Sequence, residues 1–187
     1  PNFSDFIDFF NKAALNMKAI PGYNIVYADK YDTIYYISNG RIPVRDKNYN
    51  WKITLPGNTS ATLWNQLHPI DALPQVLQPK SGFVYNTNHS PFHSTEGSEN
   101  PRVTDITMGY ETLENNRSKR FEEMLKPLNK VNYEDFKRIK FSRQFPSNFY
   151  FPYTIDTLFL LDETKYTDIA DLISNLTCLK PACCPNL

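Results

Sequence analysis

The sequence has little cysteine and glycine, no net charge and no long run of apolar residues. Its 187 residues include 3 Cys and 6 Gly, and 20 basic side chains balance 20 acidic ones. This balance argues against nucleic acid as the main partner and against a polybasic membrane anchor, because both need clustered excess cation. A mean hydropathy of -0.51 and scattered charges exclude a transmembrane helix, which needs about 18 or more mostly apolar residues in a row. We therefore expect neither a nucleic-acid nor a membrane partner.

Cysteine and histidine are too sparse to define a metal centre. The cysteines Cys178, Cys183 and Cys184 cluster at the C-terminus, which gives no disulfide framework and, without a nearby His, a poor zinc set. Of the three histidines, His68 is isolated. His89 and His93 lie four apart in a proline-broken stretch, so they are either a metal pair or loop histidines. The phosphate-binding glycine loop, the GxSxG elbow and the HExxH motif are all absent.

Aromatic residues and proline are plentiful, at 14% aromatic residues and 14 Pro, which favours an ordered, loop-rich fold. Patterning and capping residues predict helices over 4–17, 113–125, 133–140 and 168–176, the last two capped by Asn132 and Thr167. Two runs rich in Tyr, Ile and Val predict a hairpin of strands 23–28 and 33–38 around a turn at 29–32. The remaining predictions are short helical turns at 63–67 and 71–76, a buried strand at 82–88, a surface loop at 89–109 and a buried element at 153–161.

Two asparagines at the end of the predicted strand 82–88 are candidate site residues. Asn86 and Asn88 are two apart, so both side chains point the same way from a strand. An Asn amide donates hydrogen bonds without changing charge, which suits an oxyanion, but the same residues also cap turns at strand ends. Spacing alone leaves both interpretations open. Arg117, taken alone, is typical of a surface salt bridge.

Five segments in fixed order carry a resemblance to a known family. They are Tyr27-Ala28-Asp29, Gly40-Arg41-Ile42-Pro43-Val44-Arg45, Leu55-Pro56-Gly57, Leu73-Pro74-Gln75-Val76 and Pro79-Lys80-Ser81-Gly82-Phe83-Val84-Tyr85-Asn86-Thr87-Asn88. Over residues 5–176 the sequence resembles the penicillin amidase family of N-terminal nucleophile hydrolases, which includes penicillin, aculeacin and acyl-homoserine-lactone acylases. The resemblance implies an α+β fold, part of an αββα sandwich with antiparallel strands and short helices. Residues 1–176 would be the central part of an acylase beta chain, followed by an atypical, disordered or artefactual Cys/Pro-rich end at 177–187.

The resemblance also implies a reaction and two site residues. Family members hydrolyse an amide by means of an N-terminal Ser whose own amine is the base, and an Asn side chain helps to hold the oxyanion. The matching positions here are Asn88 for the oxyanion hole and Arg117 for shaping the site, with Asn86 supporting the strand end. The resemblance implies no cofactor for catalysis and allows a structural calcium in the parent protein. One of its ligands would be an acidic residue in the loop after Asn88, at Glu96 or Glu99, and the other main ligands would lie outside this chain, so no metal residue is assigned.

The implied nucleophile lies outside this sequence, since Pro1 has neither hydroxyl nor thiol. We therefore expect an acylase fragment whose partners are the remaining alpha and beta chain segments of one precursor and a small acylated amide. The parent would be periplasmic or secreted, by family analogy. The alternative is a non-catalytic homologue that serves as a binding or structural module.

Overall fold

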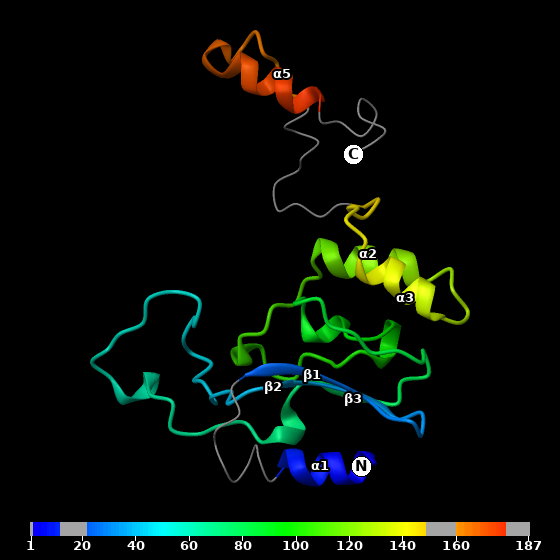
Figure 1. The fold of residues 1–187 in the computed structure, drawn as a ribbon. Helices are drawn as coiled ribbons and strands as arrows, with labels where there is room; N and C mark the ends of the chain where they lie inside the picture. The colour runs from blue at the N-terminus through cyan, green and yellow to red at the C-terminus, as the bar shows by residue number, and fades with distance from the viewer. Residues whose placement is uncertain (1, 12–21, 149–159, 179–187) are drawn as a thin grey trace. The chain divides into compact units, whose positions relative to one another are not determined.

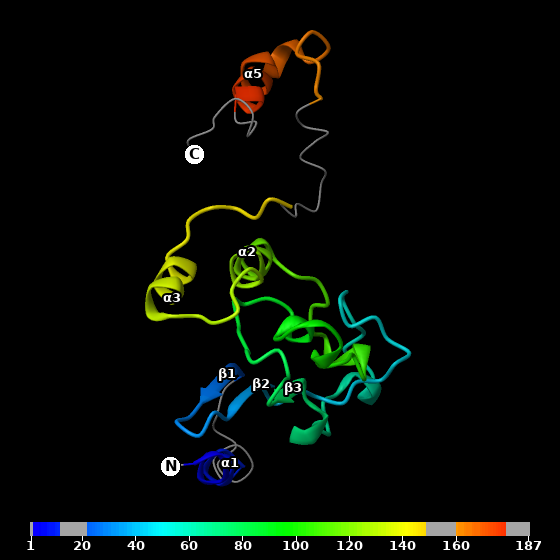
Figure 2. The same cartoon turned by 90° about the vertical axis from the view of Figure 1, so that its right-hand side faces the viewer.

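The computed structural model describes residues 2–11, 22–148 and 160–178 (Figures 1 and 2). It divides the chain into two units, Pro1–Ser118 and Lys119–Leu187. The first unit contains α1 (Phe3–Asn11), β1 (Tyr23–Ala28), β2 (Ile34–Asn39), β3 (Gln75–Leu77) and the short 3-10 helices η2 (Ser60–Thr62), η3 (Ile70–Ala72), η4 (Pro91–His93), η5 (Gly97–Glu99) and η6 (Ile106–Met108). Helix α2 (Asn116–Leu125) begins in the first unit, and the second contains α3 (Tyr133–Lys140), η7 (Thr167–Ile169) and α5 (Ala170–Cys178). The predicted α+β class is confirmed by these helices and strands.

A three-stranded antiparallel sheet with the order β1-β2-β3 organises the first unit. The predicted hairpin is confirmed, with Tyr27 of β1 opposite Tyr35 of β2. Its turn forms as the turn chemistry predicted, because one carboxylate oxygen of Asp29 accepts hydrogen bonds from the backbone N–H groups of Tyr31 and Thr33 at 2.8 and 3.0 Å. The central strand β2 is buried along almost its whole length, so both faces of the sheet are covered there.

Helix α1 covers one face of the sheet (Figure 1). Its Phe6 stacks on Tyr27 with the ring centroids 4.5 Å apart, and Phe10 joins Tyr35 and Ile37 in the main hydrophobic cluster. Removing this apolar surface from water stabilises the unit. The predicted helix over 4–17 is confirmed as far as the described residues reach, and its remainder, 12–17, lies outside them.

The opposite face of the sheet is covered by the chain around residues 79–112 (Figure 2). The Tyr110 hydroxyl donates to the Ser38 carbonyl at 3.1 Å, and the Tyr36 hydroxyl donates to Asn24 at 2.8 Å. Burial raises the pKa of Tyr36 to about 12, so this hydroxyl stays a donor at neutral pH. The Tyr36 bond joins β2 to β1, and the Tyr110 bond attaches the covering segment, which carries the candidate site, to the sheet.

The structure corrects three predictions in the covering region. The turns predicted at 63–67 and 71–76 are wrong in place, because the 3-10 turns lie at 60–62 and 70–72, and residues 75–77 form β3 instead. The strand predicted at 82–88 is wrong, since positive φ angles at Gly82 and Asn88 interrupt any extended run. The stretch 89–109 is a surface loop only in its later part: Ser90, Ser94 and Thr95 are 1% exposed or less because the chain folds back on itself there, whereas residues 96–98 and 102–104 are exposed.

The helices of the second unit were predicted more closely. Helix α3 spans the predicted residues, and Asn132 and Asp135 form a reciprocal capping box. Helix α2 begins at Asn116, three residues after the predicted start at 113. Thr167 is not a cap, because η7 begins there. Residues 153–159 of the predicted buried element lie outside the described residues, and none of the helices in the described part is long and apolar enough to cross a membrane.

Candidate functional site

Asn88 lies in a tight turn on the covering segment, with its side chain exposed. Its φ of 57° is in the left-handed region, which Asn tolerates better than most residues. The turn closes where the Asn88 backbone N–H donates to the Asn86 side-chain oxygen at 3.1 Å. Asn86 therefore supports the conformation of Asn88, and its own Nδ2 is buried without a hydrogen-bond partner in the described part of the chain.

Arg117 meets Asn88 at the open side of this turn. The Arg117 Nη2 donates to the Asn88 Oδ1 at 3.3 Å, across 29 residues of sequence. A guanidinium has only donors, so it fixes the oxygen end of the amide toward itself and leaves the Nδ2 group facing away. Within the described residues, no hydrogen bond occupies that Nδ2. The arrangement thus presents a neutral, oriented N–H donor at the surface.

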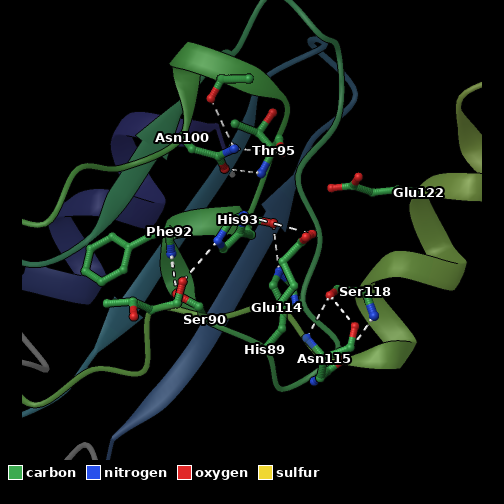
Figure 3. A network of polar contacts seen from close by, with 12 residues as sticks. His89, Ser90, Phe92, His93, Thr95, Asn100, Glu114, Asn115, Ser118 and Glu122 are labelled. Atoms are coloured by element: carbon green, nitrogen blue, oxygen red, sulfur yellow. Dashed lines mark hydrogen bonds and ion pairs between the residues drawn. The ribbon is translucent and has the colours of Figure 1, made fainter. Parts of the chain in front are cut away.

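The start of α2 holds Arg117 in place (Figure 3). Asn115 caps the helix: its Oδ1 accepts from the Ser118 N–H at 2.9 Å, while its own N–H donates to the Ser118 hydroxyl oxygen at 3.2 Å. The other end of the same amide, Nδ2, donates to the Thr87 carbonyl at 3.2 Å. One side chain therefore joins the helix end that carries Arg117 to the residue before Asn88.

The turn belongs to a longer loop, residues 83–95, whose two ends are joined by hydrogen bonds inside the fold. The Tyr85 N–H donates to the Ser94 carbonyl at 3.0 Å, and the Thr95 hydroxyl donates to the Phe83 carbonyl at 2.8 Å. Thr95 also exchanges hydrogen bonds with the Asn100 side chain, whose Oδ1 accepts at 2.9 Å and whose Nδ2 donates at 3.1 Å. Because these polar groups pair with one another inside the fold, the loop is a rigid base for Asn88.

The two histidines of this loop face different neighbours, as Figure 3 shows. His89 is 8% exposed, and its Nε2 lies 2.7 Å from the carbonyl oxygen of His93. The His93 ring instead has Nε2 3.2 Å from the Thr112 carbonyl and Nδ1 3.9 Å from a Glu114 oxygen. The geometry therefore matches loop histidines rather than a metal pair. His68, the third, lies 3.9 Å from Asp105, away from this turn.

Glu99 and Glu96, the two positions considered for a calcium ligand, have different surroundings. Both carboxylate oxygens of Glu99 already accept backbone hydrogen bonds, from Lys80 at 2.8 Å and Ser81 at 3.1 Å. Glu96 is exposed and begins η5 without a side-chain bond. In the parts of the chain with described positions, no three His, Cys, Asp or Glu side chains gather into a group that could hold a metal by itself. Cys183 and Cys184 lie outside the described residues.

The structure brings together the two predicted site residues, Asn88 and Arg117. It adds Thr87 and Asn115, which sequence reasoning missed, and it places His89, considered there only as a metal or loop histidine, against the same turn. Asn115 carried a usable signal, because an Asn directly before a helix is a typical N-cap. Thr87 and His89 carried none, because their role depends on how the loop closes.

Comparison with known proteins agrees with the motif order. The family model for penicillin amidase matches residues 3–169. A stretch of 68 residues is 35% identical to penicillin G acylase of Escherichia coli, and it covers 36% of this chain but 8% of that protein. The chain therefore spans a small part of its curated relative. With the family model matching most of its length, the chain belongs to the penicillin amidase family.

Proposed function

We propose that this chain provides the oxyanion-binding side of an acylase site that hydrolyses a linear amide, with Asn88 as the donor. The observation that carries the proposal is the hydrogen bond from Arg117 to the Asn88 Oδ1, which leaves Nδ2 free to donate outward. Amide hydrolysis passes through a tetrahedral intermediate with a negatively charged oxygen, and a preorganised neutral donor stabilises that charge.

Arg117 is proposed to act through Asn88. Because its guanidinium holds the amide oxygen, the amide cannot flip and present an acceptor to the oxyanion. Its positive charge near the site also favours a developing negative charge. Removing one oxyanion donor costs about 10²–10³-fold in rate, and this sets the upper limit on what the fixed orientation of the amide contributes.

The nucleophile is proposed to lie in another segment of the same precursor. Family membership favours an N-terminal Ser whose own amine takes its proton, so no separate His base is needed. The acyl group would pass to Ser, and water would release the acid. The remaining alpha and beta segments would supply the acyl pocket and the second oxyanion donor, in a periplasmic or secreted parent. Any structural calcium of that parent is expected to take its ligands from those segments.

The substrate class proposed is an amide between a hydrophobic or aromatic acyl group and an amine or lactone head group. Side chains of beta-lactams, acyl-homoserine lactones and acylated peptides share this chemistry. What supports it is membership of the family and the likeness of one stretch to penicillin G acylase. The donor geometry at Asn88 is compatible with each of them, because it addresses the carbonyl that they have in common.

The test is Asn88→Gly in the full-length protein, with acyl release from a chromogenic amide as the readout. Glycine accepts the φ of 57° without strain, so this variant removes the amide and keeps the turn. We expect kcat/KM to fall about 10²–10³-fold. The matched control is Asn58→Gly at an exposed loop position, which should leave turnover unchanged. Near-normal turnover of Asn88→Gly would refute the oxyanion role, and a wild-type protein inactive on all three amide classes would favour the non-catalytic homologue.

A further inference from the structure

His89 follows Asn88 directly, yet its side chain points into the fold. It is 8% exposed, and its ring stacks on Tyr85 with centroids 4.6 Å apart and an interplanar angle of 22°. A buried imidazole next to an exposed, oriented amide needs a physical reason, because burying polar nitrogens is unfavourable unless they are hydrogen-bonded. Both ring nitrogens do have a partner: Nδ1 is within hydrogen-bond distance of the turn that carries Asn88, and Nε2 is within hydrogen-bond distance of His93 in η4.

The partners of the two nitrogens define the protonation state of the ring. The Thr87 backbone N–H, which can only donate, points at Nδ1 over 3.1 Å, and the Thr87 hydroxyl lies 2.9 Å from the same atom. Nε2 lies 2.7 Å from the His93 carbonyl, which can only accept. Nδ1 must therefore be the acceptor and Nε2 the donor, which is the neutral Nε2–H tautomer. A proton on Nδ1 would face the Thr87 N–H and remove that bond.

These contacts restrain the residue before Asn88 from two sides. The Thr87 N–H donates to His89, while the Thr87 carbonyl accepts from Asn115 at 3.2 Å. The next residue, Asn88, then adopts its left-handed φ of 57°, a conformation unfavourable for a non-glycine residue unless its surroundings hold it. The His89 bond is thus part of what holds the Asn88 backbone, and with it the direction of the Asn88 amide.

We propose that His89, as the neutral Nε2–H tautomer, is a positioning residue for Asn88. It touches no reacting atom. It acts by holding the Asn86–Thr87 peptide, while Asn115 holds the carbonyl of the Thr87–Asn88 peptide, so that the Arg117-oriented amide faces one direction. The effect on turnover rests on the proposed acylase function, whereas the tautomer and the restraint on Thr87 do not.

The first test observes the wild-type full-length protein. Nitrogen-15 labelling of histidine, with the His89 signals assigned by their loss in His89→Phe, distinguishes the tautomers by NMR. We expect a protonated Nε2 and an unprotonated, hydrogen-bonded Nδ1 at neutral pH. A proton on Nδ1, or on both nitrogens, at neutral pH overturns the proposal, whether or not any variant folds.

The second test compares variants by hydrogen–deuterium exchange of a peptide spanning residues 86–90. His89→Phe keeps a ring on Tyr85 but has no acceptor, so the Thr87 amide should exchange about tenfold faster. His89→Asn places an amide oxygen near the position of Nδ1 and should restore much of the protection. The matched control is His93→Phe, since the His89 ring contacts the backbone carbonyl of His93 and not its side chain. It should leave exchange at residue 87 unchanged.

Kinetics separate positioning from general damage to the fold. In His89→Phe we expect kcat to fall about 10–100-fold with KM within about twofold, because the misplaced donor matters most in the transition state. His89→Asn should recover part of kcat. Equal exchange and equal kcat in His89→Phe and wild type would overturn the proposal. If the wild type shows no acylase activity, the proposed function fails, and the tautomer and exchange measurements still decide the role of His89.

Discussion

The guanidinium of Arg117 lies 3.3 Å from the side-chain oxygen of Asn88, and this pair joins the start of α2 to the turn at 86–89. The two residues are exposed, but each stands on a buried base. Ser118, beside Arg117, is 0% exposed, and His89, beside Asn88, is 8% exposed. Two surface side chains are therefore held in register by the buried residues next to them, which is the arrangement that a preorganised site requires.

Arg117→Leu should lower turnover while leaving the fold intact. The guanidinium is exposed, so its loss removes little packing, but it frees the Asn88 amide to rotate and present its oxygen outward. We expect kcat to fall about tenfold to a hundredfold, measured as acyl release by the full-length protein. Arg102→Leu, at another exposed arginine with no partner among the described residues, is the control and should leave kcat unchanged. Equal kcat for both variants would mean that the Arg117 contact does not orient Asn88 for catalysis.

Asn115→Asp should separate the two bonds of that side chain. A carboxylate still accepts from the Ser118 N–H and suits a helix N-terminus, so the free energy of unfolding should change by less than about 1 kcal/mol. It cannot donate to the Thr87 carbonyl, so the turn loosens and kcat should fall about tenfold.

The matched control makes the same change at a helix cap that has no link to the turn. Asn132→Asp alters the N-cap of α3, where the side chain accepts from the Asp135 N–H. Chemical denaturation and acyl release should then show similar stability for both variants and a loss of turnover in Asn115→Asp alone. Unchanged turnover in Asn115→Asp would show that the Thr87 contact is dispensable.

How far the sequence predicted the fold depends on whether the signal was local. The hairpin was predictable because Asp29 holds its turn through bonds that stay within a few residues. Helix α3 was predictable because its cap and charges lie within its own first and last turns. The structure of residues 82–109 was not predictable. The burial of Ser90, Ser94 and Thr95 comes from the chain closing on itself rather than from any apolar pattern.

Two residues of the site could be predicted from the sequence, but the contacts within it could not. Asn88 and Arg117 were identified through motif order and resemblance, and the contact between them became visible only in three dimensions. The contacts of His89 and Asn115 with Thr87 were not predicted, because a single polar residue in a polar stretch has no periodic signal that shows what it faces. Their roles depend on which backbone groups the closed loop leaves unpaired, and that is a property of the fold.

Gly109→Ala should destabilise the first unit. Gly109 has a φ of 80°, and a Cβ there would lie 2.7 Å from the Arg45 Nη1. That guanidinium donates to the Thr107 carbonyl at 2.7 Å, so it cannot move aside without losing the bond. Left-handed strain and the displaced arginine together predict a loss of about 1–3 kcal/mol in the free energy of unfolding. Gly57→Ala, with nothing within 4 Å of its Cβ, should change stability by less than about 0.5 kcal/mol in the same denaturation measurement. Similar midpoints for both variants would contradict this account.

Because of Asp105, the free energy of unfolding of this region should fall at low pH. The Thr107 hydroxyl and backbone N–H donate to one Asp105 oxygen at 2.7 and 2.8 Å, which, against the opposing effect of burial, holds the pKa of Asp105 below its ordinary value of 3.8. The unfolded chain therefore binds the proton more readily than the folded one. The stabilisation is present above about pH 4 and is lost as the pH falls through the lower folded-state pKa.

Asp105→Asn removes this titration. Its deficit in the free energy of unfolding, relative to wild type, should be largest near pH 6 and should shrink toward pH 3, as followed by urea denaturation at both values. Asp71→Asn is the matched control, because Asp71 accepts no hydrogen bond among the described residues, and its difference from wild type should not vary in this way. A deficit for Asp105→Asn that stays constant from pH 6 to pH 3 would mean that the carboxylate's hydrogen bonds to Thr107 do not stabilise the folded state through its charge.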